Sequence, residues 1–448
     1  MALNVRQIAE DTANKLNGVV YYDNLNKFYT YESGKHWQEI SNHQLEAIIF
    51  NYNEDCIYLP NQAEQVRRTM RSKFILSRFE KMNQNRNKIT LSDNVLNLDT
   101  FKLDPQNKED YSTLLTDISL NDDDIKKARK SSVKQLLDDA PILKKYMYST
   151  FHKDHYKDPE ATIETIQLMF GSCLLPHCKT QKAFFLLGSG SNGKSVLVKI
   201  LTALIGKENV SSVPFHRLGT PDVLRMNNKL VNISAESDRM KFKDDVSTSI
   251  FKSAVTGDPI HTDVKYKDAC EFDPMATLIF VMNHLPEIND DSYGFIRRIV
   301  AIPFNREIPE NEKITDLDNQ IINEELKQLF IFALSGAIKL HKSDYKDFKM
   351  CEDTREQTEI YKTMINPFND FMKTRIIMND NAKIKVTDFK CIYDKYIEET
   401  ENPNNKIKTN QELGVALKQY MKSQNRSYSK KTLGNGGGYY YYGIASRY

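Results

Sequence analysis

The chain has 448 residues, is 40% hydrophobic and 27% charged, and carries a formal net charge of +2. This length and composition suit two or three globular domains and exclude a disordered chain. The longest apolar runs, 183–187 and 276–282, are much shorter than the ~20 residues of a membrane span, and the first residues lack a signal-peptide apolar region. Six cysteines without paired zinc-like spacing are interpreted as reduced and mostly structural. We therefore expect a soluble, cytoplasmic protein with no membrane contact.

Residues 1–135 predict a mixed α/β domain. A helical pattern opens the chain, and short aromatic strands follow near 19–22, 27–31 and Trp37. Helical patterns at 142–151 and 163–175 then indicate a collar that leads into the next block. We assign the collar and that block, residues 136–345, to one domain.

A glycine-rich segment, GSGSNGKS, lies between the apolar strand 183–187 and a helix that ends before Gly206. Its members are Gly188, Ser189, Gly190, Ser191, Asn192, Gly193, Lys194 and Ser195. The glycines let backbone N–H groups point at an anion, Lys194 adds a positive charge, and the Ser195 hydroxyl can bind Mg²⁺. A Gly/Ser-rich turn alone can simply connect a strand to a helix, but the full pattern between a strand and a helix predicts an ATP site.

After this loop, strand-like runs at 230–235, 276–282 and 299–304 alternate with helical segments, which is typical of an α/β layer with a mostly parallel sheet. The first of these strands ends in acidic residues. Glu236 is our first candidate, and Asp238 the second, for the carboxylate that binds Mg²⁺ and orients the attacking water. A strand that simply ends in solvated acids is the alternative.

Two further positions follow in the same block. Asn283 ends an apolar strand, where an amide can donate to a γ-phosphate oxygen and accept from the water. Taken singly, an asparagine at the end of a strand is more often a turn former. Arg297 and Arg298 precede the next strand. They are candidates for arginine fingers that reach across a subunit boundary and neutralise transition-state charge, and the alternative is that they form structural ion pairs at the start of the strand.

A hairpin is predicted between the acidic strand end at Glu236 and the sensor Asn283. It follows 257–260 and carries Lys265, Tyr266 and Lys267 near its tip. In a ring this tip would face the channel and grip a phosphate backbone, whereas the alternative is an ordinary solvated hairpin.

The end of the chain, residues 360–448, differs in charge and pattern. Residues 361–448 hold fifteen Lys and Arg against eight Asp and Glu, a net charge of +7, which leaves −5 for the rest. One helix face near 389–397, a second helix with a capping box at Thr409 and Glu412, and two strands around a glycine tip predict a winged helix. Lys430 and Lys431 are its candidate DNA contacts. Of the tyrosines 439–442, we expect alternation to bury two in the core.

The ordered motifs resemble those of the superfamily-three helicases, in particular the phage, plasmid and poxvirus primase-helicase group, and of the self-loading replicative helicases of bacterial mobile islands. The motifs are GSGSNGKS, KLVNISAESD, FKSAVTGDPI with VKYK, LIFVMNHLPEI and GFIRRIVAIPF. The resemblance covers nearly the whole chain. Many relatives carry a primase domain first, whereas this chain starts at the region that precedes the ATPase, so the resemblance does not imply priming activity.

The resemblance implies an AAA+ α/β ATPase that binds ATP and Mg²⁺ and assembles as a ring, a hexamer, around DNA. Lys194 and Ser195 would be its phosphate and magnesium residues, Asn283 the sensor, and Arg297 or Arg298 the finger given in trans. The strand end has one acid followed by Ser237 where relatives have two adjacent acids, so the roles of Glu236 and Asp238 stay open. A separate primase or accessory replication protein is a candidate partner.

We therefore predict an ATP-dependent replicative DNA helicase, the replication initiator of a phage or mobile genetic element. The main alternative is a helicase loader or remodelling ATPase that acts on a protein partner at DNA; it shares every nucleotide residue but separates no strands. A P-loop kinase for a small molecule is a third hypothesis, and the predicted winged helix argues against it.

Overall fold

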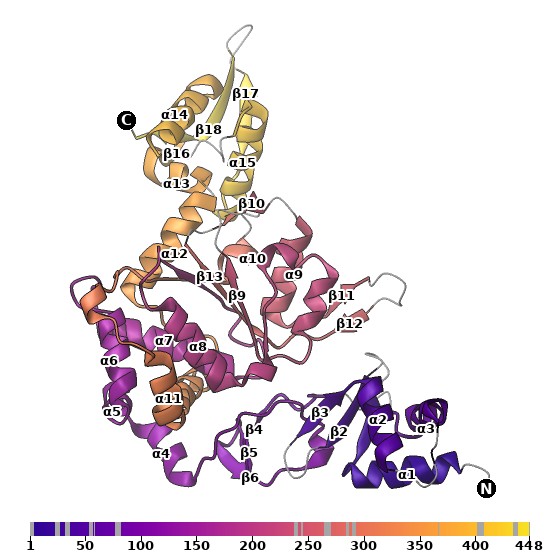
Figure 1. The fold of residues 1–448 in the computed structure, drawn as a ribbon. Helices are drawn as coiled ribbons and strands as arrows, with labels where there is room; N and C mark the ends of the chain where they lie inside the picture. The colour runs from indigo at the N-terminus through magenta and orange to yellow at the C-terminus, as the bar shows by residue number, and fades with distance from the viewer. Residues whose placement is uncertain are drawn as a thin grey trace. The chain divides into compact units, whose positions relative to one another are not determined.

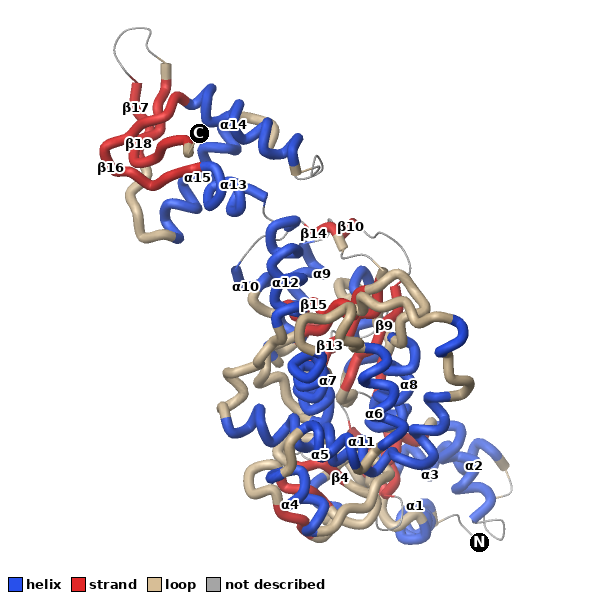
Figure 2. Tube along the Cα trace, turned by 90° about the vertical axis from the view of Figure 1, so that its left-hand side faces the viewer, coloured by secondary structure: helices blue, strands red, loops and turns tan. Residues whose placement is uncertain are grey.

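The computed structural model describes residues 4–22, 27–31, 36–52, 57, 59–76, 82–236, 241–242, 245–263, 270–283, 286–288, 293–365, 367–400, 407–432 and 438–447. The chain divides into two compact units, residues 1–286 with 297–355 and residues 287–296 with 356–448. Figures 1 and 2 show the elements of each unit. Among the helices described, none is both long enough and apolar enough to cross a lipid bilayer.

The first unit begins with helices packed on an antiparallel sheet. The elements are α1 (Val5–Lys15), β1 (Val19–Tyr22), β2 (Lys27–Tyr31), β3 (Trp37–Ile40), α2 (Asn42–Tyr52) and α3 (Pro60–Lys73). A second antiparallel sheet follows, formed by β4 (Lys88–Thr90), β5 (Val95–Asn97) and β6 (Lys102–Asp104). Trp37 is buried, and its indole N–H donates to the Lys108 carbonyl at 2.8 Å, which ties the first sheet to the segment after the second. Both helices and strands are therefore present, as the sequence predicts.

A parallel sheet forms the centre of the first unit. Its strands are β7 (Ala183–Leu187), β8 (Val210–Ser211), β9 (Val231–Glu236), β13 (Thr277–Met282) and β15 (Ile299–Pro303). They lie in the order β15-β7-β13-β9-β8, and all neighbouring pairs are parallel. The predicted α/β layer with a parallel sheet is thus confirmed.

Helices cover both faces of this sheet. On one face lie α7 (Pro159–Leu174), α8 (Lys194–Ile205) and α11 (Leu317–Lys342), and on the other lies α9 (Asp245–Thr256). The helices α4 (Asp122–Lys130), α5 (Val133–Asp138) and α6 (Pro141–Thr150) pack against α11. Phe184 of β7 belongs to the core shared with α7, α8 and α11, and these three helices lie together (Figures 1 and 2). Phe185, on the other face, stacks near Phe251 of α9. Successive side chains of the buried strand β7 therefore pack into the hydrophobic cores on the two opposite faces of the sheet.

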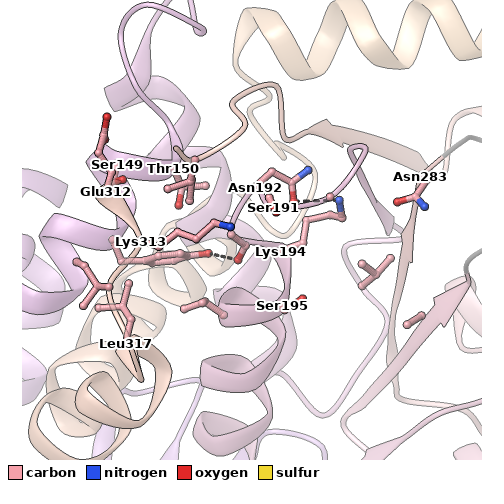
Figure 3. A pocket seen from close by; sticks show the side chains of 18 of the residues that line it. Ser149, Thr150, Ser191, Asn192, Lys194, Ser195, Asn283, Glu312, Lys313 and Leu317 are labelled. Carbon is pink, nitrogen blue, oxygen red and sulfur yellow. Dashed lines mark hydrogen bonds between the residues drawn. The ribbon is translucent and has the colours of Figure 1, made fainter. Parts of the chain in front are cut away.

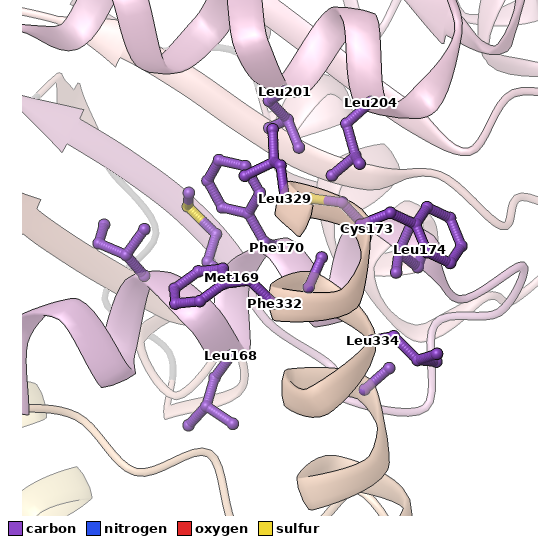
Figure 4. Packing of buried hydrophobic residues seen from close by; sticks show 14 of the residues in the cluster. Leu168, Met169, Phe170, Cys173, Leu174, Leu201, Leu204, Leu329, Phe332 and Leu334 are labelled. Atoms are coloured by element: carbon purple, nitrogen blue, oxygen red, sulfur yellow. The ribbon is translucent and has the colours of Figure 1, made fainter. Parts of the chain in front are cut away.

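The collar helix α7 and helix α11 approach each other unusually closely. A Cβ atom on Gly171 would lie 2.3 Å from the Ala337 nitrogen, and one on Gly336 would lie 2.2 Å from the Gln167 oxygen. Leucine and aromatic side chains of α7, α8 and α11 pack together in the same core (Figure 4). The two glycines are required because the helix backbones touch there.

The second unit contains a smaller antiparallel sheet. Its elements are α12 (Glu352–Ile365), which begins in the first unit, then α13 (Pro367–Arg375), β16 (Ile376–Lys385), α14 (Val386–Glu399), α15 (Asn410–Ser423), β17 (Ser429–Thr432) and β18 (Tyr439–Ser446). The strand order is β16-β18-β17. The capping box of α15 is confirmed, because Glu412 N–H donates to Thr409 Oγ1 at 3.2 Å and Thr409 N–H donates to Glu412 Oε2 at 3.1 Å. Strand β16 was not predicted.

Shorter elements complete the chain. These are β10 (Lys241–Phe242), β11 (Ile260–Thr262), β12 (Cys270–Phe272), β14 (Glu287–Ile288), α10 (Tyr293–Ile296) and the 3₁₀ turns η2 (Lys108–Asp110), η3 (Lys207–Asn209), η4 (Phe215–Arg217), η5 (Pro221–Met226) and η6 (Glu310–Glu312). Strands β11 and β12 pair antiparallel, with Ile260 opposite Phe272, so the base of the predicted hairpin is present. Lys265, Tyr266 and Lys267 lie outside the described residues.

Candidate nucleotide-binding site

The glycine-rich loop follows β7 and leads into α8. Three of its residues have positive φ angles: Gly190 at +119°, Ser191 at +46° and Gly193 at +86°. Glycine tolerates this backbone, which turns successive N–H groups toward one point. Within the described part of the chain, no side chain caps the first turn of α8. The N–H groups at the start of this helix can therefore bind an anion.

The segment after β15 holds the loop in shape. Ile308 N–H donates to the Ser191 carbonyl at 2.8 Å, and the Asn192 amide donates to the Phe304 carbonyl at 3.3 Å. A Cβ atom on Gly188 would lie 2.8 Å from the backbone carbonyl oxygen of Phe304, so position 188 requires glycine. These contacts come from the protein itself, and the loop is preorganised for its ligand.

Lys194 is the first residue of α8 and is only 7% exposed. Its ammonium donates to the Gly188 carbonyl at 2.5 Å and to Asn192 Oδ1 at 3.1 Å, both neutral acceptors. Burial lowers the pKa of Lys194 to about 8. A phosphate beside the ammonium would raise this pKa again, because an opposite charge favours the charged form. Lys194 is thus suited to an anionic ligand.

A cavity of about 500 Å³ opens over the loop (Figure 3). Its walls come from α6, from the ends of β9 and β13, and from the segment between β15 and α11. Leu317 and Lys313 lie on one side of Lys194, and Asn283 lies on the other (Figure 3). The volume and the mixed lining suit a nucleoside triphosphate, with its phosphates on the loop and its base toward the apolar side of the cavity.

The collar contributes two residues to this site that sequence reasoning missed. The Tyr146 hydroxyl donates to the Gly193 carbonyl at 3.0 Å. A Cβ atom on Gly193 would lie 2.8 Å from Thr150 Oγ1, so the collar also packs directly on the loop. The signal that points to them is their i, i+4 spacing on one face of a helix that precedes the loop.

The topology brings the predicted acidic strand end and the predicted sensor to the same edge of the sheet as the loop. Strand β13 lies between β7 and β9, and Met282 pairs with Leu187 on one side and with Glu236 on the other. Asn283 follows at once, is exposed, and lines the cavity. The backbone of Glu236 ends β9 at this level, whereas Asp238 lies outside the described residues. Carboxyl ends of parallel strands are where such sheets bind ligands.

Arg297 and Arg298 lie at the opposite edge of the sheet. They precede β15, whose first residue, Ile299, pairs with Ala183 at the start of β7. A strand of five residues spans about 17 Å, longer than an arginine side chain, so neither residue can reach the loop of its own chain. Arg298 is 8% exposed, whereas Arg297 is exposed and donates to Gln181 Oε1 at 2.9 Å. Of the two, Arg297 is accessible to a second molecule.

Arg297 lines a cavity whose walls are rich in basic side chains. Its volume is about 670 Å³. The cations that line it are Arg86, Lys179, Lys182, Arg297 and Lys346. The one carboxylate in its described lining, Asp344, pairs with Lys346 at 2.6 Å. The amino edge of the sheet therefore carries an excess of positive charge, complementary to phosphate.

The candidate DNA contacts at the C-terminus do not share one face. In the register of β17 and β18, Lys430 lies opposite Tyr441 and Lys431 lies opposite Tyr440. Residues opposite each other share a face and successive residues alternate, so the two lysines lie on opposite faces of the sheet. Lys430 lines a groove of about 470 Å³ beside α15 together with Lys418. The adjacent pair is therefore not a single patch.

The expectation for the four tyrosines is partly wrong. Only Tyr441 is fully buried, where it packs on Phe389 with ring centroids 5.4 Å apart. Tyr439 is 57% exposed, and Tyr440 and Tyr442 are half-buried. Gly443, with φ +86°, breaks the alternation, so the next core residue on β18 is Ile444.

Together these features define an α/β protein with a central five-stranded parallel sheet and a glycine-rich loop between β7 and α8, consistent with a P-loop ATPase. A family described as "Family of unknown function (DUF5906)" matches residues 186–298. That span begins in β7 and ends at Arg298, so it holds the loop and both strand ends of the site.

Among curated proteins, the chain is a distant homologue of "Putative helicase L207/L206" of Acanthamoeba polyphaga mimivirus. The two are 24% identical over 250 residues, which cover 49% of this chain and 25% of the mimivirus protein. The chain thus spans about a quarter of the length of this relative.

Among solved structures, two A-form apo structures of the NrS-1 C-terminal region match nearly the whole chain. One is 14% identical with a TM-score of 0.48 and covers 96% of this chain and 97% of that one. The other is 13% identical with a TM-score of 0.49 and covers 99% and 100%.

Proposed function

We propose that the chain is an ATP-dependent replicative DNA helicase with an AAA+ core of the superfamily-three type, which acts as a ring, a hexamer, and initiates replication of a phage or mobile genetic element. The observation that carries the proposal is the division of the central sheet. The loop, Lys194 and Asn283 meet over one cavity at the carboxyl edge, while accessible Arg297 lies at the amino edge. Such a site is complete only when two subunits meet.

ATP hydrolysis would use the residues at the carboxyl edge. The loop N–H groups and Lys194 bind the phosphates, and Asn283 donates to a γ-phosphate oxygen while it accepts from the attacking water. Ser195 and either Glu236 or Asp238 would hold Mg²⁺, which neutralises phosphate charge when bound. The other carboxylate orients the water; Glu236 is our first candidate for that role.

A neighbouring subunit would supply the missing charge. Its Arg297, at the amino edge, would reach the γ-phosphate and stabilise the negative charge that develops in the transition state. Contact between a carboxyl edge and an amino edge is head-to-tail, and head-to-tail contacts that close produce rings. This is the physical reason to expect a ring.

DNA would be held in two places. Lys265, Tyr266 and Lys267, which lie in the sequence between β11 and β12, are proposed to grip a strand in the channel. The C-terminal domain, with its order helix, strand, two helices and two strands, is proposed to be a winged helix whose α15 and Lys430 contact duplex DNA. Its positive charge supports this assignment.

The test is strand separation on forked DNA with ATP. The wild-type protein should unwind the fork, and Lys194→Ala should not. Lys207→Ala, an exposed lysine just after α8, is the matched control and should unwind normally. ATP hydrolysis stimulated by DNA without any strand separation would favour a helicase loader and overturn the proposal.

A further inference from the structure

The C-terminal sheet has a second polar face that the proposed function does not use. In its register, Lys385, Tyr440 and Lys431 form one row across the three strands. Two positions further along β18, Lys383 lies opposite Tyr442 in a second row on the same face. We call these five residues the outer sheet face. The row between them, Ile384 with buried Tyr441, belongs to the core, so the outer sheet face lies on the side away from the core.

The outer sheet face has positive charge that the described part of the domain does not neutralise. Its three lysines are exposed, and none forms an ion pair with a described carboxylate. Strands β17 and β18 contain no acidic residue, and the single acid of β16, Asp380, pairs with Arg426 at 3.0 Å. An anionic partner is therefore complementary to this face.

The lysines contact aromatic rings. Lys383 Nζ lies 5.6 Å from the centre of the Tyr440 ring, and Lys431 Nζ lies 5.7 Å from that of Tyr442. The two tyrosines are two positions apart on β18, so their rings are about 7 Å apart along the strand. Flat rings in a row between cations are the arrangement on which successive unpaired bases stack while lysines follow the phosphates.

Duplex DNA does not fit this chemistry equally well. In a duplex the faces of the bases are covered by their neighbours, and only edges and phosphates remain for a protein to contact. Lys430 and the α15 groove, on the opposite face, offer a helix and a cation for that purpose. The two faces of one small sheet therefore suit two forms of nucleic acid.

We propose that the outer sheet face binds single-stranded nucleic acid, with bases stacked on Tyr440 and Tyr442 and phosphates bound by Lys383, Lys385 and Lys431. This goes beyond the proposed function, because it is a single-strand site outside the ATPase and does not depend on ATP hydrolysis. Close to a fork, such a site would hold an unwound strand.

The test is a titration of the full chain, without nucleotide, with fluorescein-labelled oligothymidylate and with a duplex of the same length. Tyr440→Leu/Tyr442→Leu should weaken single-strand binding by about tenfold for each lost stacked base. Duplex affinity should change by less than about twofold. Tyr440→Phe/Tyr442→Phe, which keeps the rings, should bind like wild type, and Tyr439→Leu, a neighbour on the other face, is the matched control.

A second variant keeps the test valid if the leucine variant folds poorly. Lys383→Ser/Lys385→Ser/Lys431→Ser should reduce the salt slope of single-strand binding by about 2, at about 0.7 for each lost phosphate contact. Any binding in a central channel is common to all variants. Photocrosslinking of an iodouridine-substituted strand therefore tests directly whether the strand contacts the outer sheet face. The expected result is a crosslink to Tyr440 or Tyr442.

Three outcomes would overturn the assignment. One is single-strand affinity unchanged in both the tyrosine and the lysine variants. Another is equal loss of duplex and single-strand binding. The last is displacement of the oligothymidylate by polyglutamate at equal charge, which would show a general polyanion site without base stacking.

Discussion

The two sheets of this protein use their residues in different ways. In the central parallel sheet, the candidate site lies at the strand ends, where β7, β13 and β9 finish at one edge. In the C-terminal antiparallel sheet, the candidate contacts lie on the strand faces, and Lys430 and Lys431 belong to different faces. In the central sheet, residues of one site can therefore be far apart in sequence. In the C-terminal sheet, residues that are adjacent in sequence belong to different sites.

The difference follows from sheet geometry. All strands of a parallel sheet run the same way, so the residue after each strand comes to the same edge whatever its side-chain direction. On a face, a shift of one position reverses every side chain. Edge sites are thus tolerant of register, whereas face sites depend on it.

The largest effect is expected at the carboxyl edge. Lys194→Ala removes the ammonium that donates to the Gly188 carbonyl and to Asn192 Oδ1, and ATP hydrolysis should fall by about 10³-fold. Assembly should be largely unaffected, because the residue lies inside a cavity. Steady-state ATPase assays with Lys207→Ala as control measure this, and normal turnover by Lys194→Ala would refute the site.

The amino edge gives the next largest effect. Arg297→Ala should lower kcat by about 10²–10³-fold with little change in ATP affinity, since a finger acts on the transition state. Arg298→Ala, at a position only 8% exposed, should instead lower the thermal stability. The two variants are compared by kcat, KM and Tm, and the reverse pattern would exchange their roles.

Packing under the nucleotide site is tested at the α7–α11 contact. Gly336→Ala should destabilise the first unit by about 1–3 kcal/mol through overpacking, although alanine gains about 1 kcal/mol in helix propensity. Ser172→Ala, which loses only a bond to Leu168 within its own helix, is the control. Thermal unfolding of both variants decides; a Gly336→Ala protein as stable as wild type would show that the helices are not in contact there.

A smaller effect is expected from pH. The pKa of Lys194 is lowered to about 8, and ATP binds the charged form, so binding above this pH requires uptake of a proton. Affinity for ATP should therefore be constant below about pH 7 and fall roughly tenfold by about pH 9. Isothermal titration in buffers of different ionisation enthalpy detects the proton, and Lys194→Arg should abolish the dependence.

The smallest effect separates the two faces of the C-terminal sheet. Lys430→Ser should lower the salt slope of duplex binding by about 0.9, whereas Lys431→Ser should leave it unchanged. Equal effects of the two substitutions on duplex binding would contradict the division of the sheet.

Much of the first unit could be predicted because its signals are local. The apolar strands, the glycine pattern and the order of Glu236 and Asn283 specify a parallel sheet with one functional edge. The contacts of Tyr146 and Phe304 with the loop could not be predicted, since they join segments that only the tertiary fold brings together.

The second unit was predicted less completely. Strand β16 carries a polar run near Asp380 and changes register between Met378 and Lys383, so it lacks clean alternation. The exposure of Tyr440 and Tyr442 depends on that register and on the bend at Gly443. No local pattern specifies either.

The most direct test of the central claim, that each ATP site is completed by a neighbouring subunit, is the ATPase activity of mixed variants. Lys194→Ala and Arg297→Ala subunits should each be inactive alone. Mixed, they should recover activity, because some interfaces then pair an intact loop with an intact Arg297. Failure to recover any hydrolysis at any ratio, with mixed assembly verified, would contradict the shared site.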